Sequence, residues 1–228
     1  MVAVSHLQKK YGKQTVLKDV SFEVHSGEWI AIAGRNGCGK STLLQILAGI
    51  LRPDGGSVQY YGKPASAAVI RRYVGYVPQE NPLLEELSVW DNLHLWDLKK
   101  ESHLEAAAQQ FGLDGLYKKR VRDLSGGMKR RLSLACAWMG FPPVLLLDEP
   151  TTALDLYYKE SIQHWIREFV EGNGIVIMTS HDETELKQAH RCLWMEDGQI
   201  NEIGNYEIGK WRERYGNEFR PDDGEANQ

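Results

Sequence analysis

A glycine-rich loop between an apolar run and a helical pattern constrains this chain most. Residues 29–33 are apolar, residues 34–42 read Gly-Arg-Asn-Gly-Cys-Gly-Lys-Ser-Thr, and the leucines and isoleucines of residues 43–50 recur at the spacing of one helix face. A strand, a glycine-rich loop and a helix in this order form the pattern of a phosphate-binding loop. We expect the backbone N–H groups of the loop and the positive end of the helix dipole to face phosphate oxygens.

Three side chains of this loop bear on its chemistry. Lys40 is placed to reach β- and γ-phosphates, and the hydroxyl of Ser41 is placed to ligate Mg²⁺. Cys38 lies in the positive field of the loop, which favours a thiolate there. The plainer interpretation of Cys38 is a small residue that fits a tight loop.

A second apolar run ends in two acids. Residues 144–147 are uniformly apolar, as in a strand buried on both faces of a parallel sheet, and Asp148 and Glu149 follow. Active-site carboxylates of open α/β sheets lie at such strand ends. Asp148 is suited to hold Mg²⁺ through water, and Glu149 to take a proton from an attacking water. With the phosphate-binding loop, these acids predict hydrolysis of a nucleoside triphosphate.

Three further residues have both a functional and an ordinary interpretation. Gln79 follows a predicted strand at residues 73–77, where it could hold Mg²⁺ or position water, or be a polar loop residue. His181 follows the predicted strand 174–179, where it could contact a γ-phosphate, or be a turn histidine. Tyr11 lies in a turn, where its ring could stack on a base, or be an ordinary turn aromatic.

Between residues 81 and 139 the chain becomes predominantly helical in pattern. Ser88 and Ser125 are natural helix N-caps, and Asp155 is predicted to cap a later helix that runs to about Val170. The helix after Ser125 carries three consecutive cations, residues 129–131, where they oppose the helix dipole. A bound anion would offset that cost, and a solvated basic face is the alternative.

Composition and charge limit the partners and the location that we expect for the chain. The chain has 228 residues, of which 42% are hydrophobic, and a formal net charge of −4, so it has no basic excess for binding nucleic acid. Its three cysteines lack metal-ligand spacing, which is typical of a reducing compartment. Residues 1–10 have no apolar core of a targeting segment, and the longest uncharged run, residues 132–147, is too short to span a bilayer. We therefore expect a cytoplasmic chain with no nucleic-acid partner.

Taken in order, these motifs resemble those of the ATP-binding cassette (ABC) ATPases over nearly the whole chain. The resemblance lies in an aromatic loop at Tyr11, a Walker A motif at Gly34–Thr42, a Q-loop at Gln79, a signature at Leu124–Met128, a Walker B motif at Val144–Asp148 followed by Glu149, a D-loop at Ala153–Asp155 and a switch histidine at His181.

The resemblance implies a head-to-tail dimer with two ATP molecules and Mg²⁺ at its interface. Tyr11 would stack on adenine, Glu149 would polarise the attacking water, and His181 would steady that water and the γ-phosphate. The implied catalytic residues are Gln79, Glu149 and His181, and the implied metal ligands are Ser41, Gln79 and Asp148. The implied nucleotide-binding residues are Tyr11, Gly34, Asn36, Gly37, Cys38, Gly39, Lys40, Ser41, Thr42, Ser125, Gly126, Gly127 and Asp155, of which Ser125–Gly127 would act on the nucleotide of the opposite subunit.

The predicted fold is α/β: a P-loop NTPase core with a mostly parallel sheet, an N-terminal antiparallel β subdomain and an inserted α-helical subdomain. We expect residues 1–80 and 141–205 to form the core with its β subdomain, residues 81–140 to form the helical signature subdomain, and residues 206–228 to form a C-terminal helix and a disordered tail.

Met128 stands where many ABC ATPases have glutamine, a variant common in exporter-like members with separate ATPase subunits. The sequence therefore favours an exporter ATPase, a homodimer or heterodimer on the inner face of the cell membrane, bound to a permease on a separate chain. Trp90 and Trp96 are candidates for that contact. Import is the near alternative, and a soluble, non-transport ABC ATPase is the second. A GTPase is disfavoured because the chain has no Asn-Lys-x-Asp pattern, and a GTPase or a small-molecule kinase would leave residues 124–127 unexplained.

Overall fold

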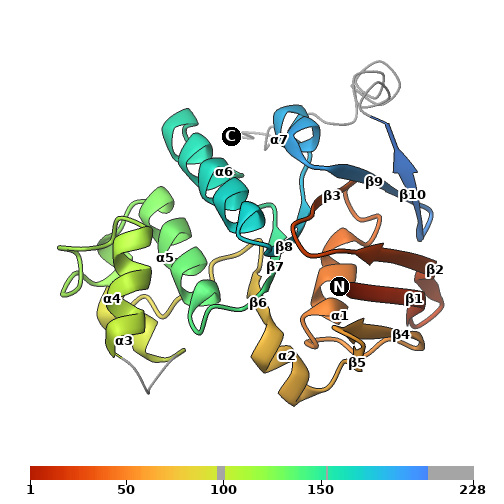
Figure 1. The fold of residues 1–228 in the computed structure, drawn as a ribbon, viewed down its shortest axis with the longest axis horizontal. Helices are drawn as coiled ribbons and strands as arrows, with labels where there is room; N and C mark the ends of the chain where they lie inside the picture. The colour runs from red at the N-terminus through yellow and green to blue at the C-terminus, as the bar shows by residue number, and fades with distance from the viewer. Residues whose placement is uncertain (97–100, 153, 205–228) are drawn as a thin grey trace, which may run out of the picture.

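Buried parallel strands form the centre of the molecule. The computed structural model describes residues 1–96, 101–152 and 154–204. The strands β9 (Arg191–Glu196), β3 (Trp29–Gly34), β8 (Ile175–Thr179), β7 (Val144–Asp148) and β6 (Val74–Val77) lie side by side in that order and run parallel (Figure 1). Every residue of β3, β7 and β8 is buried, which explains their uninterrupted apolar sequences.

The other strands extend this sheet to ten. β1 (Val2–Tyr11), β2 (Gln14–Val24), β4 (Gly55–Tyr60) and β5 (Lys63–Pro64) pair antiparallel, and β10 (Gln199–Ile203) forms a hairpin with β9. Gln199 of β10 bridges to Asp19 of β2 and so joins the antiparallel strands to the parallel ones. The predicted mixed α/β fold, mostly parallel at its centre with antiparallel N-terminal strands, is confirmed.

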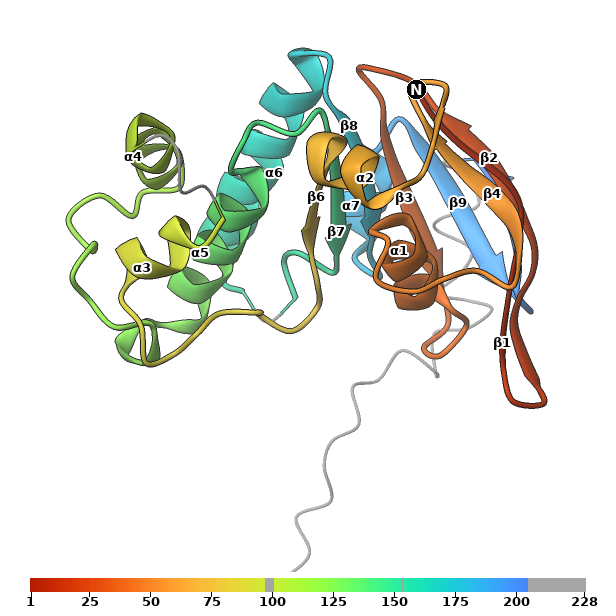
Figure 2. The same cartoon turned by 90° about the horizontal axis from the view of Figure 1, so that it is seen from below.

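Two hydrophobic clusters lie on opposite sides of β3. Trp29, Ala31 and Ala33 belong to one cluster, whereas the alternate residues Ile30 and Ile32 belong to the other, as the two-residue period of a strand requires. The first cluster includes buried residues of α6 (Leu156–Glu171), and the second includes those of α1 (Lys40–Leu47). The centre of the sheet is thus covered on both faces (Figure 2).

The helices α3 (Val89–His94), α4 (Glu101–Gln110) and α5 (Gly126–Trp138) gather at one end, beyond the edge strand β6 (Figure 1). Ser88 caps α3 in a capping box with Asp91, and the hydroxyl of Ser125 accepts the N–H of Met128 at the start of α5. A 3₁₀ turn, η1 (Val121–Asp123), precedes α5. The predicted caps at Ser88 and Ser125 are therefore confirmed.

Two further short helices are α7 (Glu183–Gln188) and α2 (Ala67–Tyr73). The helix α2 was not predicted, because none of its residues is fully buried and its sequence lacks a clear apolar periodicity. The predicted C-terminal helix and tail lie outside the described residues. Among the described residues, no helix combines the length and the apolar character that a membrane span needs.

Replacing Gly75 of β6 with alanine should destabilise the fold. An added Cβ at Gly75 would overlap the carbonyl oxygen of Ala137 at the end of α5. We expect the free energy of unfolding in urea to fall by about 1–3 kcal/mol, the usual cost of overpacking. Gly55→Ala in β4 is the control, because its Cβ would meet only the flexible side chain of Gln8, and it should change stability by less than about 0.5 kcal/mol. Equal effects of the two substitutions would contradict this packing of β6 against α5.

Candidate functional site

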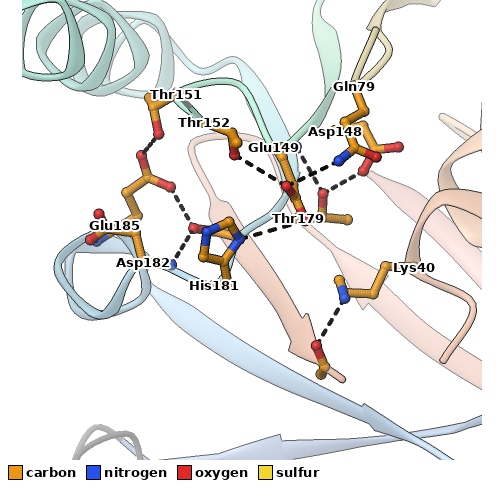
Figure 3. Close-up of polar contacts among 12 residues, drawn as sticks. Lys40, Gln79, Asp148, Glu149, Thr151, Thr152, Thr179, His181, Asp182 and Glu185 are labelled. Carbon is orange, nitrogen blue, oxygen red and sulfur yellow. Dashed lines mark hydrogen bonds and ion pairs between the residues drawn. The ribbon is translucent and has the colours of Figure 1, made fainter. Parts of the chain in front are cut away.

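A cavity of about 510 Å³ opens near the carboxyl ends of the central strands. It brings together residues that are far apart in the sequence: Val16, Asn36, Gly37, Gly39, Lys40, Ser41, Thr42, Gln79, Glu149, Thr152 and His181. Most of these residues are predicted site residues. Figure 3 shows Lys40, Gln79, Glu149 and His181 around this region.

The glycine-rich loop leads from β3 into α1. Gly39 is the N-cap of α1 with a φ of 113°, and a Cβ there would lie 2.9 Å from Cγ1 of Val16, so only glycine fits. Lys40 is 6% exposed, and its Nζ donates to the carbonyl oxygens of Gly34 at 2.8 Å and Arg35 at 3.1 Å. The loop therefore curls around its own ammonium group and holds this positive charge at the wall of the cavity, which suits an anion.

The first acid of the site is fixed by the neighbouring strand. Asp148 pairs in register with Thr179, and the Thr179 hydroxyl donates to Asp148 Oδ1 at 2.6 Å. The same hydroxyl oxygen accepts the backbone N–H of Glu149 at 2.9 Å. Asp148 is 2% exposed and lies beneath the cavity wall rather than on it.

The second acid lies on the wall of the cavity. Oε2 of Glu149 accepts hydrogen bonds from Gln79 Nε2 at 3.3 Å and from Thr152 Oγ1 at 3.1 Å, and Oε1 lies 3.6 Å from His181 Nδ1 (Figure 3). Its backbone has a φ of 45°, which is unusual for a residue other than glycine. Such left-handed geometry costs on the order of 1–3 kcal/mol and persists only where surrounding contacts hold it.

The contact between Glu149 and His181 shifts the protonation of both. It raises the pKa of His181 and, with help from Thr152 and Lys40, lowers the pKa of Glu149 against the opposing effect of burial. Both shifts favour the charged pair, so Glu149 remains a carboxylate that can accept a proton or orient a water.

A buried carboxylate supports this region from behind. Glu185 of α7 is 1% exposed and accepts hydrogen bonds from the hydroxyls of Thr151 and Ser180, the latter at 2.5 Å. Ser180 Oγ in turn accepts the N–H of Asp182 at 2.9 Å. Glu185 thus ties the segment after Glu149 to the segment that carries His181.

Several predicted residues do not line this cavity in a single chain. They are Tyr11, Gly34, Cys38, Ser125, Gly126, Gly127, Asp148 and Asp155. Tyr11 is 47% exposed with Lys9 Nζ 5.6 Å from its ring centroid. Asp155 caps α6 by accepting the N–H of Tyr158, as predicted.

The structure bears on two questions of charge that the sequence leaves open. Cys38 lines a neighbouring cavity, and burial raises its pKa more than Lys40 lowers it, which favours the plainer interpretation of a small loop residue over a thiolate. The cations of α5 have partners within the chain. Lys129 Nζ pairs with Glu85 at 2.5 Å, and Arg130 and Arg131 donate to backbone carbonyls.

Three residues of the site were not predicted from the sequence. Val16 comes from β2, Thr152 lies three residues after Glu149, and Thr179 ends an apolar strand. The position of Thr179 beside the predicted β7 end was the one available clue, because parallel neighbours end at the same edge. The sequence offered no clue to Val16, since its approach to the glycine-rich loop depends on how β2 packs against that loop.

The donors near the loop suit a hard cation. Ser41, Gln79 and Asp148 offer a hydroxyl, an amide oxygen and a carboxylate, which are the oxygen ligands that Mg²⁺ prefers together with substrate phosphates. Among the described residues there is no group of three or more His, Cys, Asp or Glu side chains that could hold a metal. The residues present fit Mg²⁺ brought with a nucleotide.

Comparison with known proteins gives concordant matches. A protein-family model described as ABC transporter matches residues 17–152. The solved dimeric structure of the ATP-binding cassette MJ0796, in a post-hydrolysis state bound to ADP and Pi, has a TM-score of 0.82 and 25% identity over 90% of this chain and 99% of that one. The structure of cbiO1 from Clostridium perfringens, described as part of the ABC transporter complex cbiONQ, has a TM-score of 0.79 and 27% identity, covering 95% and 93% of the two chains.

Two curated relatives are similar in sequence. The sulfate/thiosulfate import ATP-binding protein CysA of Pectobacterium atrosepticum is 33% identical over 89% of this chain and 66% of its own length. The spermidine/putrescine import ATP-binding protein PotA of Mycoplasma mycoides subsp. mycoides SC is 36% identical over 91% of this chain and 62% of its own length. The chain thus spans less than two thirds of the length of these relatives.

The pair of Glu149 and His181 should make stability depend on pH. The raised pKa of His181 stabilises the fold below the pKa of an unfolded histidine, about 6.5, and this contribution is lost as pH rises through the folded value. The lowered pKa of Glu149 stabilises the fold above about 4.3, and this contribution is lost as pH falls through the folded value. We therefore expect His181→Ala to reduce the free energy of unfolding more at pH 5.5 than at pH 8.5.

The difference should stay below about 1 kcal/mol, because the His181 side chain is 47% exposed and the pair is screened by water. Ser26→Ala, which removes an exposed side chain with no titrating group after β2, is the control and should act alike at both pH values. Urea denaturation of the free protein measures both variants. A His181→Ala effect that is the same at the two pH values would contradict the pairing.

Proposed function

This chain belongs to the ABC transporter family, and from this premise we propose that it is the subunit that binds and hydrolyses ATP to power import through a separate membrane subunit. One observation carries the proposal: a single cavity joins the phosphate-binding loop around Lys40 to the carboxylate of Glu149 and the ring of His181. A cation, a general base and a histidine around one space are what hydrolysis of a γ-phosphate requires.

In the proposed mechanism the loop binds the triphosphate. Lys40 exchanges its contacts with loop carbonyls for β- and γ-phosphate oxygens, and the N–H groups of residues 36–42 surround the same phosphates. Tyr11, exposed at the end of β1, stacks on the adenine. Ser41, Gln79 and Asp148 would hold Mg²⁺, which when bound neutralises charge that develops on the phosphates.

Hydrolysis is the attack of water on the γ-phosphorus. The carboxylate of Glu149 orients this water and accepts its proton as the bond to phosphorus forms, while the bond from the γ-phosphorus to the bridging oxygen breaks and ADP leaves. His181 holds Glu149 and donates to the γ-phosphate. The lowered pKa of Glu149 keeps the base ionised at neutral pH.

The remaining predicted residues act across a dimer. Ser125, Gly126 and Asp155 are exposed and do not line the cavity of their own chain. We propose that they contact the nucleotide bound by a second copy of the chain, arranged head to tail with the first. The dimeric structure of the cassette MJ0796, bound to ADP and Pi, supports a dimer. Closure of N–H groups at the start of α5 on a γ-phosphate would make hydrolysis depend on dimerisation.

The sequence alone was misleading about the direction of transport. It favoured export because of Met128, whereas the two relatives above are both named as import proteins, and they support the importer alternative. Their named substrates differ in chemistry and charge, so they support a direction and not a substrate. We propose a cytoplasmic location on the inner membrane face, and the division into a core and a helical signature subdomain expected from the sequence.

Affinity capture from detergent-solubilised native membranes, followed by mass spectrometry, tests the transport assignment. We expect a polytopic membrane protein to be enriched and to be lost with Trp96→Ala, since Trp96 is 58% exposed next to α3. Phe141→Ala, at a 45% exposed aromatic elsewhere, is the control and should retain the partner. Recovery of soluble partners only would favour the non-transport ABC ATPases.

Glu149→Gln should separate binding from hydrolysis. The amide keeps the shape of the side chain and cannot take a proton, so ATP binding should persist, turnover should fall by about 10²–10⁴-fold, and an ATP-bound dimer should accumulate. Phosphate release and size-exclusion chromatography with ATP measure these outcomes. Unchanged turnover would refute the role of Glu149.

Lys40→Ala complements Glu149→Gln, because it should impair the binding of the nucleotide rather than its hydrolysis. Removing a buried ammonium group that faces the phosphates should weaken ATP affinity by at least about tenfold, measured with a fluorescent ATP analogue. Wild-type affinity in Lys40→Ala would contradict the assignment of the loop.

A further inference from the structure

Arg130, in the second turn of α5, is a buried cation with an unusual set of partners. It is 4% exposed, and burial lowers its pKa to about 10, so the guanidinium stays protonated at neutral pH. It donates hydrogen bonds to five backbone carbonyls and to the side-chain oxygen of Asn81. Carbonyl dipoles from several directions thus compensate the charge.

The carbonyls belong to two separate segments of the proposed active site. In the segment after β6, Nη1 donates to the carbonyls of Pro78 at 2.6 Å and Gln79 at 3.4 Å. In the segment at the end of β7, Nη2 donates to Asp148 at 2.8 Å and Glu149 at 3.0 Å, and Nε donates to Pro150 at 2.8 Å. One side chain therefore holds the backbone of Gln79, Asp148 and Glu149 together.

The hydrogen bonds of Arg130 reach the backbone at its strained residue, Glu149. Glu149 has left-handed geometry, and its two peptide groups are both held: the N–H by Thr179 and the carbonyl by Arg130. Without the guanidinium, the carbonyl of Glu149 loses its 3.0 Å hydrogen bond and keeps the longer one from the N–H of Thr152 at 3.4 Å, so the residue is less firmly held against relaxation toward ordinary φ values. Relaxation would turn the Glu149 carboxylate away from Gln79 and His181.

Only the planar, five-donor guanidinium can make this set of contacts. Lysine has three donors on one nitrogen and cannot span carbonyls on both sides of a fork, and glutamine offers a single amino group. The neighbouring Arg131 does not share this role, because it donates to the carbonyls of Phe111 and Gly112 within the helical region.

We propose that Arg130 is a positioning residue that holds the backbones of Gln79 and Glu149 in fixed register with α5, and so keeps the general base aimed at the attacking water. Arg130 itself does not line the cavity. The inference rests on the proposed function for its effect on hydrolysis, whereas the coupling of the two segments is a property of the free protein.

Arg130→Lys and Arg130→Gln test the proposal, with Arg191→Lys as the control. The guanidinium of Arg191 in β9 also donates several hydrogen bonds, to Glu23, Glu28 and Glu202. Its replacement therefore measures the general effect of removing an arginine network away from the site. In nucleotide-free protein, amide exchange in peptides that cover 78–81 and 148–152 should accelerate together by at least about fivefold in the Arg130 variants only. For Arg130→Lys, kcat should fall by about 10- to 100-fold, the scale of a misplaced catalytic group, with ATP affinity within about threefold of wild type.

The outcomes separate the two proposals. Wild-type kcat together with wild-type exchange in Arg130→Lys would overturn the positioning role, as would a loss of kcat that merely follows weakened ATP binding. Absence of ATP hydrolysis in the wild-type and Arg191→Lys proteins would instead overturn the proposed function, and the exchange result would still judge Arg130. If neither Arg130 variant folds, exchange of the wild-type protein in mild denaturant decides: the two segments should open as one unit with the first turns of α5, and independent opening contradicts the proposal.

Discussion

The parallel pairing of β7 with β8 determines the geometry of the site. It places Asp148 opposite Thr179, so that one hydroxyl group serves the carboxylate of Asp148 and the N–H of Glu149 at once. The chain leaves both strands at the same edge, and the polar residues that follow them, Glu149 and His181, therefore meet. Because β7 and β8 are buried along their whole length, a register shift would draw the polar residues at their ends into the apolar part of the sheet, so the burial of the sheet fixes the positions of the acids.

Strain at one residue is balanced by contacts from several elements. Glu149 has a positive φ next to a buried strand, and it is held through its N–H by β8, through its carbonyl by α5 and through its carboxylate by Gln79, Thr152 and His181. Each contact alone is worth about 1 kcal/mol, which is comparable to the strain, so several are needed to keep a single conformation. A rigid carboxylate of this kind needs little reorganisation when a water has to be oriented.

Features that depend on local chemistry were predictable from the sequence. The phosphate-binding loop, the buried strand before Asp148 and the caps at Ser88, Ser125 and Asp155 are each set by a few neighbouring residues. Features that depend on distant partners were not. The carbonyls that satisfy Arg130 come from residues up to 52 positions away, so the cations of α5 looked unpartnered. A thiolate at Cys38 was one of two alternatives because the charge of Lys40 is visible in the sequence and burial is not.

The N-terminus of α5 and the turn that follows it have different roles. Its N-terminus, with Ser125 and Gly126 exposed, lies off the cavity of its own chain, while Arg130 one turn later holds the wall of that cavity. In the proposed dimer, a γ-phosphate on the opposite subunit would contact the N-terminus of the helix whose arginine positions the general base of its own subunit. Because a helix transmits displacement along its axis as a rigid element, contact at one nucleotide would then bear on the geometry of the other. The fork of Arg130 makes this connection through backbone carbonyls, which keep their hydrogen-bonding capacity whatever the nucleotide state of the site.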